Sequence, residues 1–149
     1  MTKTYRVSDY CNQFNIIRFL EEHRHFKARR KELEDKLNNI SYIPSKSDDS
    51  GVRSGNISKI PERLAFERMK IMDEISEIDI LTGLYDYGFA RLTPREQDVI
   101  LLFYSQRRST PIKRTEYCQK YLTNETDLYS RDKPEAVDHF RRIIEEYFA

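Results

Sequence analysis

Apolar side chains recur along residues 16–40 at alternating steps of three and four, a spacing that places them on one face of a helix. The eight positions of this stripe are Ile16, Phe19, His23, Phe26, Arg30, Leu33, Leu37 and Ile40. Six of them are apolar, while His23 and Arg30 weaken the case for a coiled coil. We expect one long helix over residues 8–40, capped by Ser8 or Asp9. Its stripe, with Phe19, Phe26, Leu33 and Ile40, is predicted to pack on a second helix or to mediate oligomerisation with a partner subunit.

The helical pattern stops at residue 41, where the segment 41–58 becomes rich in Ser, Asp, Gly, Pro and Asn. Such a composition is typical of a mobile linker. We therefore divide the chain into an N-terminal long helix over 1–43, a flexible linker over 44–58 and a helical domain over 59–149.

Four prolines, namely Pro61, Pro94, Pro111 and Pro134, each precede an amphipathic run. Proline suits the first position of a helix, where its missing N–H costs nothing. Helices are therefore expected at about 61–82, 94–105, 111–122 and 134–148. The glycines at 83 and 88 leave open whether the first of these ends there or continues to residue 90 with a kink. With only four glycines among 149 residues, a hairpin-rich β fold is disfavoured, and the predicted class is all-α.

Enzyme signatures are missing from the sequence, which has no P-loop, no GxGxxG, no HExxH and no GxSxG pattern. The three histidines are scattered, and Cys11 and Cys118 are far apart. We expect neither catalysis, nor a metal, nor a cofactor. No apolar run reaches 18 residues and the first residues hold no signal core, so a cytoplasmic protein without a membrane contact is expected.

Basic residues gather around the expected start of the helix at 111. Residues 106–120 hold five cations against the single acid Glu116, and the five are Arg107, Arg108, Lys113, Arg114 and Lys120. Free N–H groups at a helix start favour phosphate, and basic side chains beside them suit a DNA backbone, so this patch is either a contact to nucleic acid or a solvated loop. A second basic run at 24–31 is either a solvated helix face or a contact to nucleic acid or an acidic partner.

The segment 92–104, LTPREQDVILLFY, resembles the opening helix of a sigma-factor region-four helix-turn-helix, whose pattern is L-T-x-R-E-x-x-V-I-x-L-x-Y. The matching residues are Leu92, Thr93, Arg95, Glu96, Val99, Ile100, Leu102 and Tyr104. Thr93 and Glu96 also form a capping-box pattern. The order of long helix, linker, middle helix and final domain resembles the phage late-operon transcriptional regulators of the ArpU and RinA type. The architectural resemblance covers most of the chain, and the sharp match covers about 13 residues.

This resemblance implies a helix-turn-helix over about 92–149 that binds double-stranded DNA and activates phage or prophage late genes in the host cytoplasm. Arg107, Arg108, Lys113 and Arg114 would hold phosphates. Ser130, Arg131 and Lys133 would lie near the groove, followed by His139 or Arg142. The N-terminal helix would form a homodimer or contact RNA polymerase.

Pro134 departs from the resemblance, because it falls where the recognition helix should run and a proline inside a helix costs roughly 3 kcal/mol. Either that helix begins at Pro134 after an enlarged turn, or it is the short run 125–131. The alternative function is a helical protein-interaction or DNA-packaging adaptor, similar to a phage small terminase subunit.

Overall fold

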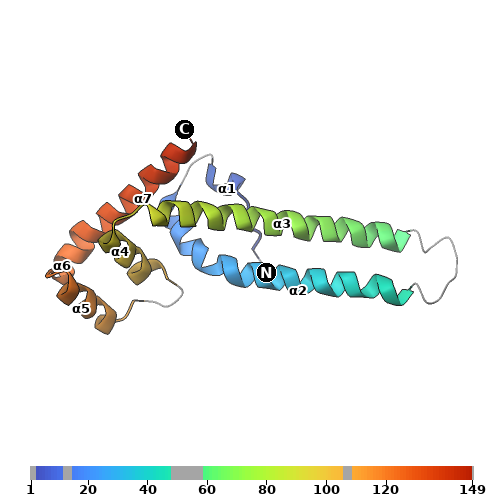
Figure 1. Cartoon of the computed structure of the whole chain (residues 1–149), viewed down its shortest axis with the longest axis horizontal. Helices are drawn as coiled ribbons and strands as arrows, with labels where there is room; N and C mark the ends of the chain where they lie inside the picture. Colours follow the sequence, from blue (N-terminus) through green and yellow to red (C-terminus); the bar gives the residue numbers. More distant parts are fainter. Residues whose placement is uncertain (1–2, 12–14, 48–58, 106–108, 149) are drawn as a thin grey trace. The chain divides into compact units, whose positions relative to one another are not determined.

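The computed structural model describes residues 3–11, 15–47, 59–105 and 109–148, and all regular secondary structure in these ranges is helical. In chain order the helices are α1 (Ser8–Cys11), α2 (Ile16–Ser47), α3 (Lys59–Ala90), α4 (Pro94–Tyr104), α5 (Pro111–Lys120), α6 (Glu125–Asp127), the π-helical turn η3 (Leu128–Asp132) and α7 (Lys133–Phe148) (Figure 1). The all-α prediction is confirmed for the described residues.

The chain divides into two compact units. Unit 1 comprises residues 1–9 and 26–81, and unit 2 comprises residues 10–25 and 82–149. Helices α2 and α3 therefore each contribute one part to unit 1 and the other to unit 2.

Unit 1 is a helical hairpin in which α2 and α3 lie side by side (Figure 1). Arg29 makes two hydrogen bonds to the Glu74 carboxylate, at 2.7 and 3.0 Å, and both residues are buried. Nε of the next residue, Arg30, lies 2.7 Å from Asp79 Oδ1. Because a charge-assisted pair of this kind needs a matching partner, the two pairs favour this register of α2 on α3.

Phe26 and Leu33 are at most 2% exposed and lie in the interior of unit 1. The N-terminal segment covers Phe26, since the Tyr5 ring meets it edge-on at 5.0 Å. Phe19 is fully buried in unit 2 and packs near Tyr10. These three side chains are thus buried within the chain.

Two boundaries differ from the sequence-based expectation. The single helix expected over 8–40 is split into α1 and α2, because Asn15 caps a new helix start by accepting a hydrogen bond from the backbone N–H of Arg18 at 3.1 Å. Helix α2 also continues to Ser47, so the first four residues of the expected linker are helical. Extending an existing helix costs less than nucleating one, which favours these added turns. Residues 48–58, the rest of that linker, lie outside the described residues.

Helix α3 runs without interruption to Ala90, so it does not end at Gly83 or Gly88. Packing explains why residue 88 is glycine, because a Cβ built there would lie 2.7 Å from Phe140 Cε1. The helix can therefore approach α7 closely only with glycine at this position.

The core of unit 2 centres on Tyr85, which is 8% exposed. The ring of His23 stacks on it at 3.5 Å, and Phe140 lies 5.4 Å away in a tilted arrangement. Burial raises the pKa of Tyr85 to about 12 and lowers that of His23 to about 4. Both side chains are consequently neutral at neutral pH, as an apolar core requires.

Candidate nucleic-acid interface

Helix α4 begins with the capping box that its sequence predicts. Thr93 Oγ1 accepts a hydrogen bond from the Glu96 N–H at 3.2 Å, and Glu96 Oε1 accepts one from the Thr93 N–H at 3.0 Å. Pro94 occupies the first turn. These local bonds satisfy N–H groups that the helix itself leaves unpaired, so the start of α4 is determined within a few residues.

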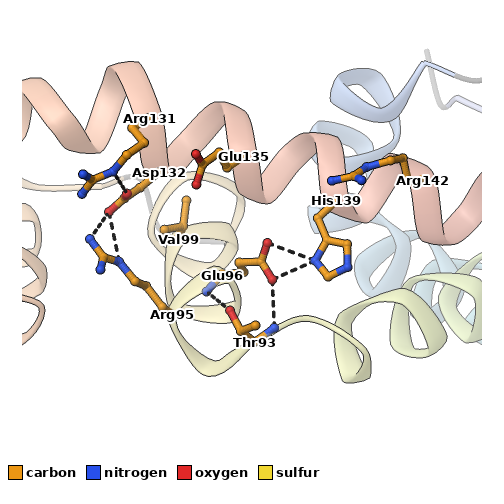
Figure 2. A pocket seen from close by; sticks show the side chains of 9 residues that line it. All are labelled: Thr93, Arg95, Glu96, Val99, Arg131, Asp132, Glu135, His139 and Arg142. Atoms are coloured by element: carbon orange, nitrogen blue, oxygen red, sulfur yellow. Dashed lines mark hydrogen bonds and ion pairs between the residues drawn. The ribbon is translucent and has the colours of Figure 1, made fainter.

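Glu96 also connects α4 to α7, because His139 Nδ1 lies 2.8 Å from Glu96 Oε1 (Figure 2). Burial acts to raise the pKa of Glu96, but the hydrogen bonds from Thr93 and His139 outweigh it and the pKa is lowered. His139, which the resemblance would place toward the groove, therefore contacts the start of α4.

Asp132 joins three helical segments of unit 2. Its Oδ2 accepts hydrogen bonds from the Tyr117 hydroxyl of α5 at 2.7 Å and from Arg95 Nη2 of α4 at 2.8 Å. Its Oδ1 accepts a third from Arg131 Nε at 3.0 Å (Figure 2). Asp132 is 7% exposed, and burial alone would raise its pKa, but these three donors lower it. The carboxylate is therefore charged and fully engaged at neutral pH.

A second polar contact holds α4 against α5. Lys120 Nζ lies 2.8 Å from Asp98 Oδ2, and the Tyr121 hydroxyl donates to the same oxygen. Thr110 caps α5 as expected, since its hydroxyl accepts from the Lys113 N–H at 3.2 Å. The cap at Thr110 and the start of α5 at Pro111 confirm the predicted helix.

The helix that follows α5 begins at Glu125, where the second alternative for Pro134 placed its start, but it does not end at residue 131. Asn124 caps it by accepting from the Asp127 N–H at 2.8 Å, and the chain then stays helical from Glu125 to Phe148. The π turn η3 lies directly before Pro134. It widens the helix where an α-helix would press the proline ring against the carbonyl of Ser130. Pro134 is thus accommodated inside a longer helix and neither starts nor ends it.

The turn between α5 and α6 contains Leu122 with φ of 53°, the one positive-φ non-glycine residue in the described part of the chain. Its side chain is 94% exposed. Left-handed backbone at a helix end usually belongs to glycine or asparagine, so the sequence did not mark this turn.

A polar cleft of about 620 Å³ lies between α4 and the segment formed by η3 and α7 (Figure 2). The lining residues are Thr93, Arg95, Glu96, Val99, Arg131, Asp132, Glu135, His139 and Arg142. Most of its charges are paired with one another, and Arg142 lies 3.1 Å from Asp138. The cleft is therefore electrostatically compensated and differs from an anion-binding groove lined by one sign of charge.

The predicted phosphate contacts are only partly described. Arg107 and Arg108 lie outside the described residues. Lys113 is exposed on the first turn of α5. Arg114 is half-buried, with Nε 3.2 Å from Glu125 Oε1 and Nη1 3.2 Å from the Ser109 hydroxyl. Arg114 therefore links the start of α5 to α6, while Lys113 remains directed to solvent.

The residues predicted near the groove have different surroundings. Ser130 is exposed and its hydroxyl donates to the Thr126 carbonyl at 2.7 Å. Arg131 is exposed, although its Nε is held by Asp132. The Lys133 ammonium lies 4.5 Å from the centre of the Phe103 ring, a cation–π contact that gives this residue a packing role.

The helical stretch from 125 to 148 carries seven acidic and four basic residues, a formal charge of −3. A groove-reading helix meets a polyanion, so this net charge opposes the approach of the whole stretch to DNA, and Arg131 is the basic residue on its first two turns.

Comparisons with known proteins give no relative: no family model, no curated protein and no solved structure matches this chain. Within the described ranges, no group of three or more His, Cys, Asp or Glu residues is arranged to hold a metal ion. No helix of the described residues is both long and apolar enough to cross a membrane.

Proposed function

We propose that this chain is a sequence-specific DNA-binding protein that regulates transcription through a region-four-like helix-turn-helix over about 92–149. The observation that carries the proposal is the hydrogen bonding of Asp132, which holds η3 to α4 and α5. The sequence LTPRE spans the start of α4. In this assignment α4 is the supporting helix, α5 is the first helix of the motif, and the stretch from Glu125 is the recognition helix. The turn at Leu122 joins the last two.

The basic segment from Arg107 to Arg114 supplies the backbone contacts, because it leads into the N-terminus of α5, where free N–H groups and the helix dipole favour phosphate. Ser130 and Arg131 are exposed on the first turns of the recognition helix, as are Glu125, Thr126 and Tyr129, and in this proposal Ser130 and Arg131 face the bases. The resemblance to phage late-operon regulators supplies the biological role, activation of phage or prophage late genes.

Salt dependence tests the backbone contacts directly. Each neutralised phosphate releases a counterion, so the slope of log K against log salt should be about −0.9 per contact. Replacing Arg107 and Arg108 by alanine should flatten the slope by about 2 units and weaken all sequences alike. A matched control is the double variant Arg18→Ala with Lys36→Ala, which removes the same charge from exposed, ion-paired sites on α2 and should leave the slope unchanged.

Recognition of a base sequence is tested by measuring the affinity of the Arg131→Ala variant for a preferred site and for random duplex DNA. Loss of a base contact should cost about 1–3 kcal/mol more on the preferred site. The preferred site comes from mapping the purified protein across the genome that encodes it. If the protein binds no duplex even at low salt, where electrostatic attraction is strongest, the DNA-binding proposal is wrong.

A second candidate is a protein-interaction or DNA-packaging adaptor, which the −3 charge of the final helical stretch favours, since an acidic surface suits a basic protein better than a phosphate backbone. Stoichiometry separates the two. A ring of many subunits would support packaging, whereas a monomer or dimer would support transcription.

A further inference from the structure

Helix α3 carries a second apolar face that nothing in unit 1 covers. Phe66, Met69, Met72 and Ile80 are 59%, 62%, 48% and 56% exposed. At 100° per residue these four side chains fall within about a third of the helix circumference. We call this surface the outer face of α3.

The opposite side of α3 is already occupied, because Glu74, Ile78 and Leu81 are buried there. The helix is thus apolar on two sides, of which only one is used within the unit. Single exposed apolar residues are common on protein surfaces, but four of them on one side of a helix over four turns, interrupted by Asp73 and Ser76, indicate an interaction site.

We propose that the outer face of α3 pairs, antiparallel, with the outer face of α3 in a second copy of this chain. The charge along α3 indicates this occupant. Residues 59–70 hold four basic and two acidic residues, whereas residues 71–81 hold four acidic residues and no basic one. An antiparallel pair of α3 helices sets each basic half against an acidic half, while a parallel pair would oppose like charges.

A two-fold arrangement with Phe66 opposite Ile80 of the other copy fits both the apolar and the charged positions. Arg68 then lies opposite Asp79, which Arg30 of the same copy also contacts, and Lys70 lies opposite Glu77, which also accepts from the Val7 N–H. Arg68 and Asp79 are 11 residues apart, and Lys70 and Glu77 are 7 apart. Either separation leaves about 20° of rotation around the helix, so the two members of each pair lie along the same edge of α3. In a two-fold pair identical edges meet, so both pairs can form twice.

Asp73 gives a test of this register. It is exposed and lies between Met69 and Ile80 along the outer face, nearest to the two-fold axis. Asp73 of each copy therefore approaches its own equivalent, with Lys70 one turn away. Removing this charge should therefore strengthen the pair. No such gain in dimer affinity is expected if an unrelated protein occupies the face.

Sedimentation equilibrium over about 1–100 µM protein tests for the dimer. We expect a monomer–dimer equilibrium whose Kd rises about tenfold or more with Met69→Glu, because each dimer then buries two charges. Ile112→Glu is the matched control, since Ile112 is 72% exposed on α5 and lies off this face. Both substitutions are at exposed sites, and circular dichroism checks that the fold is retained.

Charge variants test the orientation. The double reversal Arg68→Glu with Lys70→Glu should raise Kd for an antiparallel pair, because acidic halves then face acidic halves. A parallel pair would replace one like-charge repulsion by another and change little. Asp73→Asn should lower Kd about two- to fivefold.

Disulfide crosslinking tests the register in a background with Cys11→Ser and Cys118→Ser. A mixture of the Phe66→Cys and Ile80→Cys proteins should form a mixed disulfide, and neither alone should crosslink efficiently. The proposal is overturned by a protein that stays monomeric throughout, by a dimer insensitive to Met69→Glu, or by crosslinking of Phe66→Cys to itself. DNA binding is measured separately, so its failure would leave this result unaffected.

Discussion

Replacing the buried Asp132 by alanine should destabilise unit 2 more than replacing any of its exposed or half-buried carboxylates. The change removes the acceptor of the Tyr117 hydroxyl, which is buried, and the partner of Arg95 and Arg131. Breaking a buried charge pair costs about 3–5 kcal/mol. The side chain of Arg95 is 38% exposed and can regain water, so we expect the lower end, about 3 kcal/mol.

Two further variants separate the hydrogen bonds from the charge. Asp132→Asn keeps one acceptor oxygen and should cost about 1–2 kcal/mol, whereas Tyr117→Phe should cost about 1 kcal/mol. The double variant Asp132→Ala with Tyr117→Phe should cost about 1 kcal/mol less than the sum of the single changes, because no buried hydroxyl is then left unsatisfied.

Urea unfolding followed by far-ultraviolet circular dichroism measures these free energies, provided that the slope with urea stays constant among the variants. Asp138→Ala is the control, since Asp138 contacts Arg141 and Arg142 at the surface of α7, where solvent screens ion pairs, and its loss should leave stability nearly unchanged. A loss for Asp132→Ala no larger than this control, or strict additivity with Tyr117→Phe, would refute the assigned role.

The pH dependence of stability in the Asp132→Asn variant tests the direction of the pKa shift of Asp132. The pKa of Asp132 is lowered in the folded protein, so its stabilising contribution is present above the ordinary carboxyl pKa of about 4 and is lost as pH falls through the folded value. The difference between wild type and Asp132→Asn should therefore shrink in acid.

Three other expectations concern unit 2. Because burial lowers the pKa of His23 to about 4, stability should fall by about 1–2 kcal/mol as pH drops from 6.5 toward 4, and His23→Gln should reduce this slope in urea titrations at several pH values. Leu122→Gly should stabilise by about 0.5–1 kcal/mol by relieving positive φ, whereas Leu122→Ala should not; equal melting temperatures would contradict this. Gly88→Ala should cost about 1–2 kcal/mol through the contact with Phe140, while Gly83→Ala, which meets nothing within 4 Å, should stabilise by up to about 1 kcal/mol; a stabilised Gly88→Ala would show that α7 yields.

The starts of α4 and α5 could be predicted because their causes are local. Thr93 with Glu96, and Thr110 before Pro111, satisfy N–H groups within three residues of themselves. The helix expected at 61–82 was correct in type, and of the two ends left open at its glycines the continuation to residue 90 is the one found. The linker boundary was misplaced by four residues, because composition says little about how far an existing helix extends.

The candidate site was predicted less well, since its interactions join residues that are distant in the chain. Arg95 matched a motif, but its partner Asp132 is 37 residues away. Likewise, nothing near Arg114 in the sequence indicates that Glu125 holds it. The basic residues could be counted from sequence, whereas their engagement by acids could be found only in three dimensions.

Pro134 and the outer face of α3 show the same division between local and tertiary causes. Periodicity and caps by themselves determined that the chain is helical and where α4 and α5 begin, because these depend on backbone bonds and side chains within one or two turns. Only the tertiary structure decided that a π turn admits Pro134, that the stripe of α2 is used inside the chain, and that α3 keeps an uncovered apolar face. Packing free energy depends on which surfaces meet, and a one-dimensional pattern shows that a face is apolar without showing what covers it.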